Sequence, residues 1–368
     1  MSILIFFAVL LVLVIAHEWG HFIVAKKTGM RVDEFGFGFP PKLWGKKFKG
    51  SETEYSFNAL PLGGFVKIYG EDSLLKSDGE RAADPDFKHS FIAKPRWAQA
   101  LVLVAGVTMN VIVAWLLFSV IFMVGANTVV SEEEAVNARL TVMSVAPDSA
   151  AKQAEIPLGA EIVAVTRADG SAPELVPSAF REFTGASTEA ISVTYRLGDL
   201  GKTVSVIPQT GVLADELERP VVGLSVALIE TISYPAHQAL WHGLTTTGTQ
   251  LVAVGEGLIG FFSRAAIGQA NLDEVSGPIG LVSMVGSAAQ NGFVALMQLT
   301  AFISLNLVVI NLLPFPALDG GRLLFVAIEA VRRKALPTKL VLYANAAGFI
   351  FLLGLMAVVT ISDIVKML

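Results

Sequence analysis

Four long apolar runs dominate the pattern of hydrophobic and polar residues along the chain. They cover residues 3–25, 97–124, 293–313 and 340–361. A transmembrane helix needs about 20 mainly apolar residues, so each run is long enough to cross a bilayer. The pattern predicts a polytopic α-helical membrane protein with about four transmembrane helices.

A second pattern lies in the middle of the chain, where apolar and polar residues alternate over short stretches. Such alternation is typical of half-buried strands. Between residues 139 and 226 it predicts five strands and two short helices, which would form one compact α+β domain. The strands are expected at 140–145, 162–165, 191–196, 203–207 and 221–226, and the helices at 149–155 and 177–183.

Two Gly- and Pro-rich pieces follow the first apolar run, at residues 35–41 and 58–70. The alternation in the second piece, with a turn at residues 61–64, predicts a β-hairpin. Its apolar character within a polar loop indicates that the hairpin contacts the membrane or the first helix. An ordinary cytosolic hairpin is the alternative.

These elements divide the chain into four parts. Residues 1–125 hold the first helix, the hairpin and the second helix, and residues 126–230 hold the inserted α+β domain. Residues 231–275 mix apolar residues with Gly, Thr and a few charges, which predicts an amphipathic interfacial segment rather than a span. Residues 276–368 hold the last two transmembrane helices.

The composition agrees with a membrane protein and narrows the possible chemistry. Hydrophobic residues make up 53% of the chain and charged residues 16%, whereas soluble domains have about 25% charged residues. The chain has no cysteine. Any metal must therefore be bound by His, Asp or Glu.

Charged residues are distributed unevenly and predict the topology. Lys and Arg predominate in the loop after the first apolar run and again after residue 321, whereas residues 126–275 are net acidic. Loops rich in Lys and Arg stay in the cytoplasm. We therefore expect the inserted domain on the opposite side of the membrane.

The candidate chemistry starts at residues 17–21, which read HEWGH inside the first apolar run. His17 and His21 are four residues apart, so they lie on one face of a helix and can bind one Zn²⁺ ion. Glu18 beside them could take a proton from water. Polar and charged groups are costly within a membrane helix, which indicates a function.

A second polar group follows the third apolar run. Pro314 and Pro316 interrupt the helix, and irregular backbone at membrane depth is tolerated only where protein buries it or a cavity adjoins it. Asp319 lies in this segment. By itself, an Asp before Gly-Gly is more typical of a turn or a helix cap. However, the first and third helices reach the same membrane face, which favours a functional role for Asp319.

These motifs resemble those of the site-2 proteases, which are intramembrane zinc metalloproteases, and most closely the bacterial regulator-of-sigma-E type. HEWGH at 17–21 and NLLPFPALDGG at 311–321 are the most specific matches, and the likeness covers essentially the whole chain. The resemblance implies a zinc metalloendopeptidase with Zn²⁺ bound by His17, His21 and Asp319, and with Glu18 as the base. It also implies that Asn311 contacts the substrate.

The remaining candidates for substrate binding lie in the predicted hairpin. They are Asn58, Leu60, Pro61, Gly63, Gly64, Phe65 and Val66. The inserted domain is similar to a single PDZ domain, with residues 150–165 in the place of its helix, turn and strand. Glu155 stands where that domain commonly has Gly, which leaves its ligand mode open.

The resemblance implies hydrolysis of peptide bonds in or near the transmembrane segments of single-span proteins, such as anti-sigma factors or remnant signal peptides. The partners would be these substrates, the lipid bilayer and protein termini at the PDZ domain, without nucleic acid. The location would be a bacterial inner membrane, with the PDZ domain outside the cytoplasm and the active site near the cytoplasmic face. A membrane-anchored zinc protease for soluble peptides and an inactive PDZ scaffold are the alternatives.

Overall fold

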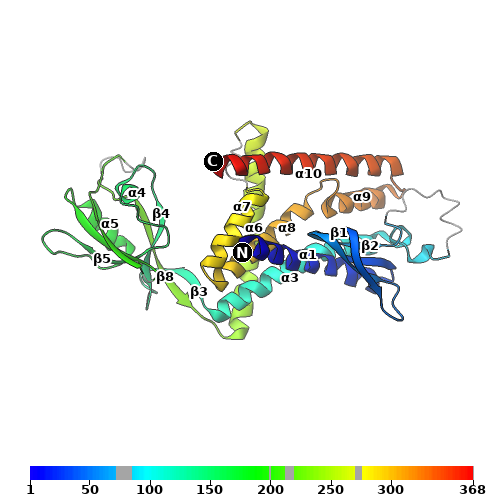
Figure 1. Cartoon of the computed structure of the whole chain (residues 1–368), viewed down its shortest axis with the longest axis horizontal. Helices are drawn as coiled ribbons and strands as arrows, with labels where there is room; N and C mark the ends of the chain where they lie inside the picture. Colours follow the sequence, from blue (N-terminus) through cyan, green and yellow to red (C-terminus); the bar gives the residue numbers. More distant parts are fainter. Residues whose placement is uncertain (72–84, 199, 212–218, 270–275, 368) are drawn as a thin grey trace. The chain divides into compact units, whose positions relative to one another are not determined.

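The computed structural model describes residues 1–71, 85–198, 200–211, 219–269 and 276–367 (Figure 1). The described chain forms two compact units. Met123–Tyr234 make the smaller unit, and Met1–Phe122 together with Pro235–Leu368 make the larger one. The smaller unit is thus inserted into the sequence of the larger one.

Four helices of the larger unit are long and apolar enough to cross a membrane. They are α1 (Ser2–Lys27), α3 (Arg96–Val124), α8 (Phe293–Leu312) and α10 (Thr338–Met367). Each coincides with one of the four apolar runs of the sequence. The prediction of a polytopic helical membrane protein is therefore confirmed.

The N-terminal half of α1 packs against α7 (Pro278–Gln290) and α8. Apolar side chains of the three helices form this core, namely Phe6, Val9, Leu13, Val285 and Ile303. The first turn of α7 is held from α10, because the Asp363 carboxylate accepts hydrogen bonds from the backbone N–H groups of Gly277 (3.1 Å) and Gly280 (2.8 Å). Such a cap satisfies N–H groups that have no partner within the helix.

The long helix α6 (Ala236–Ala266) occupies most of the segment predicted to be interfacial. Only small residues near its start are buried, including Ala239 and Gly243, and the indole N–H of Trp115 donates to the carbonyl of Leu240 at 2.9 Å. Large apolar side chains such as Trp241 are exposed. The interfacial role of this helix stays a prediction.

The loop between α1 and α3, which was predicted to be cytoplasmic, contains a β-sheet. Its strand pairing differs from that of the expected hairpin. β1 (Val32–Lys47) pairs with β2 (Glu54–Ile68), and Phe35 lies opposite Val66 on one side and opposite Tyr55 on the other. The first half of β1 therefore lies between the two halves of β2. Residues 58–68 do belong to a strand, but its partner is β1 and not a second arm within the same piece.

The smaller unit contains a six-stranded antiparallel sheet. In sheet order its strands are β3 (Ala126–Val130), β8 (Leu224–Ile232), β4 (Arg139–Val145), β5 (Glu161–Thr166), β6 (Ile191–Leu197) and β7 (Leu200–Val206). Alternate side chains of these strands, such as Leu140 and Val193, form one core with Phe180 of a short helix. The two short helices are α4 (Ala150–Gln153) and α5 (Pro177–Gly185).

Most of the predicted strands of this unit are present within a few residues of their expected ends. The last strand begins at Leu224, later than the predicted residue 221, because Val221 instead forms an isolated bridge with Gln209. The strand β3 was not predicted, since only Gly125 separates it from the end of the apolar helix α3.

Candidate metal centre

The two histidines of the HEWGH motif lie on one face of α1, as their spacing requires. Their Nε2 atoms are 3.2 Å apart, and their rings meet nearly edge to face. His21 is buried, and His17 is partly buried. Both ring nitrogens point to the same place beside the helix.

Asp319 reaches this place from the first residue of α9 (Asp319–Arg332). Its Oδ2 lies 3.0 Å from Nε2 of His17 and 3.3 Å from Nε2 of His21. The three side chains thus bring two imidazole nitrogens and one carboxylate oxygen together.

The distances between these three atoms suit a zinc ion. In a tetrahedral site with bonds of about 2.0–2.1 Å, neighbouring ligand atoms lie about 3.3 Å apart. The ligand atoms of His17, His21 and Asp319 all lie within 4.8 Å of one another. The chemistry of the set, two nitrogens and one carboxylate oxygen, is also that of catalytic zinc sites, which keep a fourth position open.

The second ring nitrogen of each histidine contacts α3. Nδ1 of His21 donates to the carbonyl oxygen of Val102 at 2.8 Å, which leaves its Nε2 without a proton and free to bind a metal. Nδ1 of His17 lies 3.4 Å from the amide nitrogen of Asn110.

The orientation of the Asn110 side-chain amide decides whether its own oxygen has a hydrogen-bond partner. Its Oδ1 is buried without a hydrogen-bond partner. The oxygen and nitrogen of an Asn amide are assigned from the hydrogen-bond network. With the amide turned, Oδ1 accepts from Nδ1 of His17, which satisfies the oxygen and leaves Nε2 of His17 free for a metal. The contact of Asn110 with His17 could not be read from the sequence, because the two residues lie on different helices.

Two glycines allow α1 and α3 to approach each other at the site. A Cβ atom at Gly106 would collide with the imidazole of His21 and come close to that of His17. A Cβ atom at Gly20 would collide with the carbonyl of Ala105. Larger residues at either position would therefore push α3 away from the histidines.

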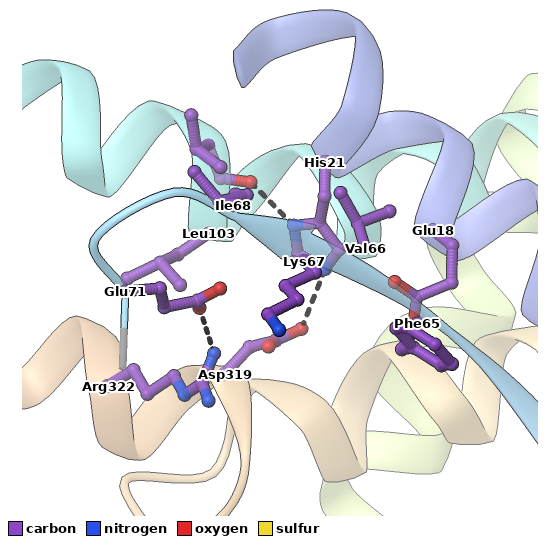
Figure 2. A pocket seen from close by; sticks show the side chains of 11 residues that line it. Glu18, His21, Phe65, Val66, Lys67, Ile68, Glu71, Leu103, Asp319 and Arg322 are labelled. Carbon is purple, nitrogen blue, oxygen red and sulfur yellow. Dashed lines mark hydrogen bonds and ion pairs between the residues drawn. The ribbon is translucent and has the colours of Figure 1, made fainter. Parts of the chain in front are cut away.

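Glu18 lies beside the three candidate ligands and borders the cavities on both sides of them. The backbone N–H of Val66 hydrogen-bonds its carboxylate. Figure 2 shows Glu18 next to Phe65 and Val66 of β2. The carboxylate is thus held where it can exchange protons with a molecule at the metal centre.

The first cavity has a volume of about 410 Å³ and extends from Glu18 and His21 along β2 (Figure 2). Phe65 and Val66, two of the predicted substrate-binding residues, line it. Its far end holds Lys67 and an ion pair between Glu71 and Arg322. The sequence did not identify these charged residues as part of the site, because Lys67 and Glu71 are far from Arg322 along the chain.

The second cavity, of about 280 Å³, contains other predicted residues. Asn311, Gly63 and Gly64 line it together with His17 and Asn110. The predicted substrate-binding residues thus lie along both cavities, on either side of the candidate metal ligands.

The remaining predicted residues are Asn58, Leu60 and Pro61. Asn58 is buried, and its amide donates to the carbonyls of Phe37 and Gly38, both at 3.1 Å, so it holds the sheet together. Leu60 is exposed, and the side chain of Pro61 is outside the described residues. Neither Asn58 nor Leu60 lines either cavity.

Known proteins are similar to this chain over nearly its whole length. The model of peptidase family M50 matches residues 5–355. A protein of Clostridium perfringens named putative zinc metalloprotease is 35% identical, over 96% of this chain and 95% of its own. A protein of the same name from Clostridium acetobutylicum is 34% identical, over 96% and 94%. The regulator of sigma-W protease RasP of Bacillus subtilis is 27% identical, over 96% of each chain. The chain therefore belongs to peptidase family M50, the site-2 protease family, and is a metalloendopeptidase, as the sequence predicted.

Proposed function

We propose that this metalloendopeptidase binds Zn²⁺ through His17, His21 and Asp319 and hydrolyses peptide bonds in or near the transmembrane segments of single-span proteins. The convergence of these three side chains carries the proposal, because two of them lie within a helix suited to cross a membrane. The names of the relatives support zinc as the metal. Anti-sigma factors and remnant signal peptides are the substrate classes that we expect.

The residues around the site have distinct roles in this proposal. When bound, Zn²⁺ supplies Lewis-acid activation of water and of the scissile carbonyl. Glu18 accepts the proton of the attacking water and returns it to the leaving amine. Asn311 lines the second cavity, where its amide donates to the oxygen that becomes negatively charged in the transition state.

A substrate helix must unwind before it can be cut, because its own hydrogen bonds occupy every peptide carbonyl. Residues 64–68 of β2 support a way to hold the unwound stretch. Among the described residues they have a strand partner on one side only, and several of them line the first cavity. An extended peptide can add to such an edge as a further strand. The β-sheet would then bind the substrate backbone beside Glu18.

The smaller unit, Met123–Tyr234, is proposed to be a PDZ-like domain outside the cytoplasm. Its acidic composition and the basic residues of the loops in the larger unit support this orientation. The chain would then lie in a bacterial inner membrane. A domain at this position would exclude substrates that still carry a large folded ectodomain, and it holds no cluster of three candidate metal ligands among its described residues.

A comparison of membrane proteomes tests the proposed function. We expect single-span proteins or their fragments to accumulate in cells that carry Glu18→Gln instead of the wild-type protein. Glu256→Gln is the matched control, since Glu256 is exposed on α6 and borders neither cavity. Accumulation of soluble peptides alone would favour a membrane-anchored protease for soluble substrates. Identical proteomes would favour an inactive scaffold.

A further inference from the structure

The backbone just before Asp319 has an unusual conformation. Ala317 has φ of +77°, in the left-handed region that residues other than Gly rarely adopt. It lies between the end of α8 and the start of α9, two residues before Asp319. A residue in this region keeps its conformation only where surrounding contacts fix it.

One such contact comes from α10. The backbone N–H of Ala317 donates to the side-chain Oδ1 of Asn345 at 3.2 Å. Both residues are partly buried. A backbone N–H group with restricted access to water needs a partner. The amide of Asn345 therefore favours the conformation in which the N–H of Ala317 points toward α10.

Two further residues on the same side of α10 contact the loop. Gly348 lies against the carbonyl of Pro316, with no space for a Cβ atom. The ring of Phe351 packs against that of Phe315, with centroids 5.5 Å apart. Residues three apart are neighbours on a helix surface, so positions 345, 348 and 351 form one contact face for residues 315–317.

We propose that Asn345 is a positioning residue for Asp319. By accepting the N–H of Ala317, it keeps the loop in the path that brings Oδ2 of Asp319 to 3.0 and 3.3 Å from the two histidines. Without this acceptor, Ala317 returns to negative φ, and Asp319 leaves its place. The inference rests on the proposed zinc site, and it gives α10 a role in metal binding although α10 supplies no ligand.

The test measures zinc affinity rather than proteolysis. The full chain is purified in detergent, and its zinc dissociation constant is obtained by competition with a chromophoric chelator. Loss of a group that orients a ligand typically weakens metal binding by about 10- to 100-fold. We expect Asn345→Leu to weaken zinc binding by about tenfold and to alter the absorption spectrum of the Co²⁺ form. Leucine suits a membrane helix, so the fold should be retained.

Three variants separate this role from a general effect on packing. Asn345→Asp keeps an acceptor oxygen and should bind zinc as the wild type does. Asn306→Leu is the matched control, because the amide of Asn306 on α8 donates to Phe302 within its own helix, at 2.8 Å. Ala317→Gly, added to Asn345→Leu, should restore most of the lost affinity, since Gly adopts positive φ without strain.

Two results would overturn the inference. One is wild-type zinc affinity in Asn345→Leu, and the other is a loss of affinity that Ala317→Gly does not reverse. If Asn345→Leu cannot be purified, Ala317→Val replaces it, since a branched side chain opposes positive φ while Asn345 stays intact; unchanged zinc binding there would also overturn the inference. Asp319→Ala separates the two proposals, because undiminished zinc binding in this variant would contradict the metal site itself.

Discussion

Nδ1 of His21 donates to the backbone carbonyl of Val102, 2.8 Å away on the neighbouring helix α3. The partner is a main-chain group, so the orientation of the imidazole depends on how closely α3 approaches α1. That approach depends in turn on Gly106, where a Cβ atom would collide with the same imidazole. The geometry of the candidate metal centre is therefore set by helix packing as well as by the ligands.

Adding a single methyl group should test this dependence. We expect Gly106→Ala to weaken zinc binding by about tenfold or more, because the new Cβ displaces His21 or separates the helices. Zinc titration of the purified protein measures the effect. The matched control is Gly354→Ala on α10, where a Cβ atom has nothing within 4 Å. Equal zinc affinities of the two variants would show that the helices can adjust.

The base and the ligands should respond differently to substitution. We expect Glu18→Gln to abolish proteolysis but to keep the metal, because Glu18 is not a ligand in the proposal. Asp319→Ala should lose both zinc and activity. Metal analysis of the purified variants, together with cleavage assays, measures the two effects. An Asp319→Ala variant with full zinc content and activity would show that the third ligand lies elsewhere.

The proposed topology can be tested by cysteine labelling, since the chain has no native cysteine. Ala172 is exposed in the smaller unit, and Lys49 is exposed between β1 and β2. In intact spheroplasts, an impermeant maleimide should label Ala172→Cys but not Lys49→Cys. The reverse result would invert the topology and place the metal centre near the opposite face of the membrane.

Substrate unwinding predicts that helix-weakening residues speed cleavage. Gly or Pro near the cut site should raise the rate, because each lowers the cost of unwinding by roughly 1–3 kcal/mol. A series of substrates with these residues at successive positions, assayed with purified enzyme, measures this. Cleavage rates that do not depend on substrate helicity would favour entry of segments that are already unfolded.

The edge of β2 is expected to act in the same step. Val66→Pro removes an N–H donor and should slow cleavage while zinc is retained. That N–H also contacts Glu18, so the substrate series is needed beside this variant. If the proline variant is slow with helical substrates only, the edge acts in unwinding; if it is equally slow with unfolded peptides, its effect arises from Glu18.

The smaller unit is expected to restrict the choice of substrates. Replacing residues 126–232 by a short Gly-Ser linker should allow cleavage of substrates that keep their ectodomains, because the unit itself holds no part of the candidate metal centre. Cleavage of paired substrates with and without an ectodomain measures the change. Loss of cleavage of both substrates, with zinc binding intact, would indicate that the unit has a required docking role.

The sequence alone was enough to predict the spans and the common helix face of the two histidines, because both depend on strong local signals. Apolar runs of sufficient length have few alternatives to a transmembrane helix, and the spacing of His17 and His21 fixes their common face. Asp319 required more, since its position next to them arises from tertiary packing across 302 residues. The family resemblance supplied it.

Other features could not be predicted because no local pattern encodes them. The first half of β1 pairs on both sides with β2, and register across a sheet depends on which edges meet. The helix α7 lies within an interval of uncharged residues in which period and length do not separate a short helix from a span. The contact between Asn345 and Ala317 joins a polar residue of α10, which belongs to no motif, to the loop between α8 and α9.

The distance of 302 residues between His17 and Asp319 has a consequence for biosynthesis. Chains are made at about 5–20 residues per second, so roughly 15–60 s pass between the appearance of the two residues. During this interval the newly inserted α1 has two of the proposed ligands and lacks the third. If the proposed ligands bind the metal, the nascent enzyme cannot attack neighbouring membrane proteins, or copies of itself, until α9 has emerged from the ribosome and reached α1.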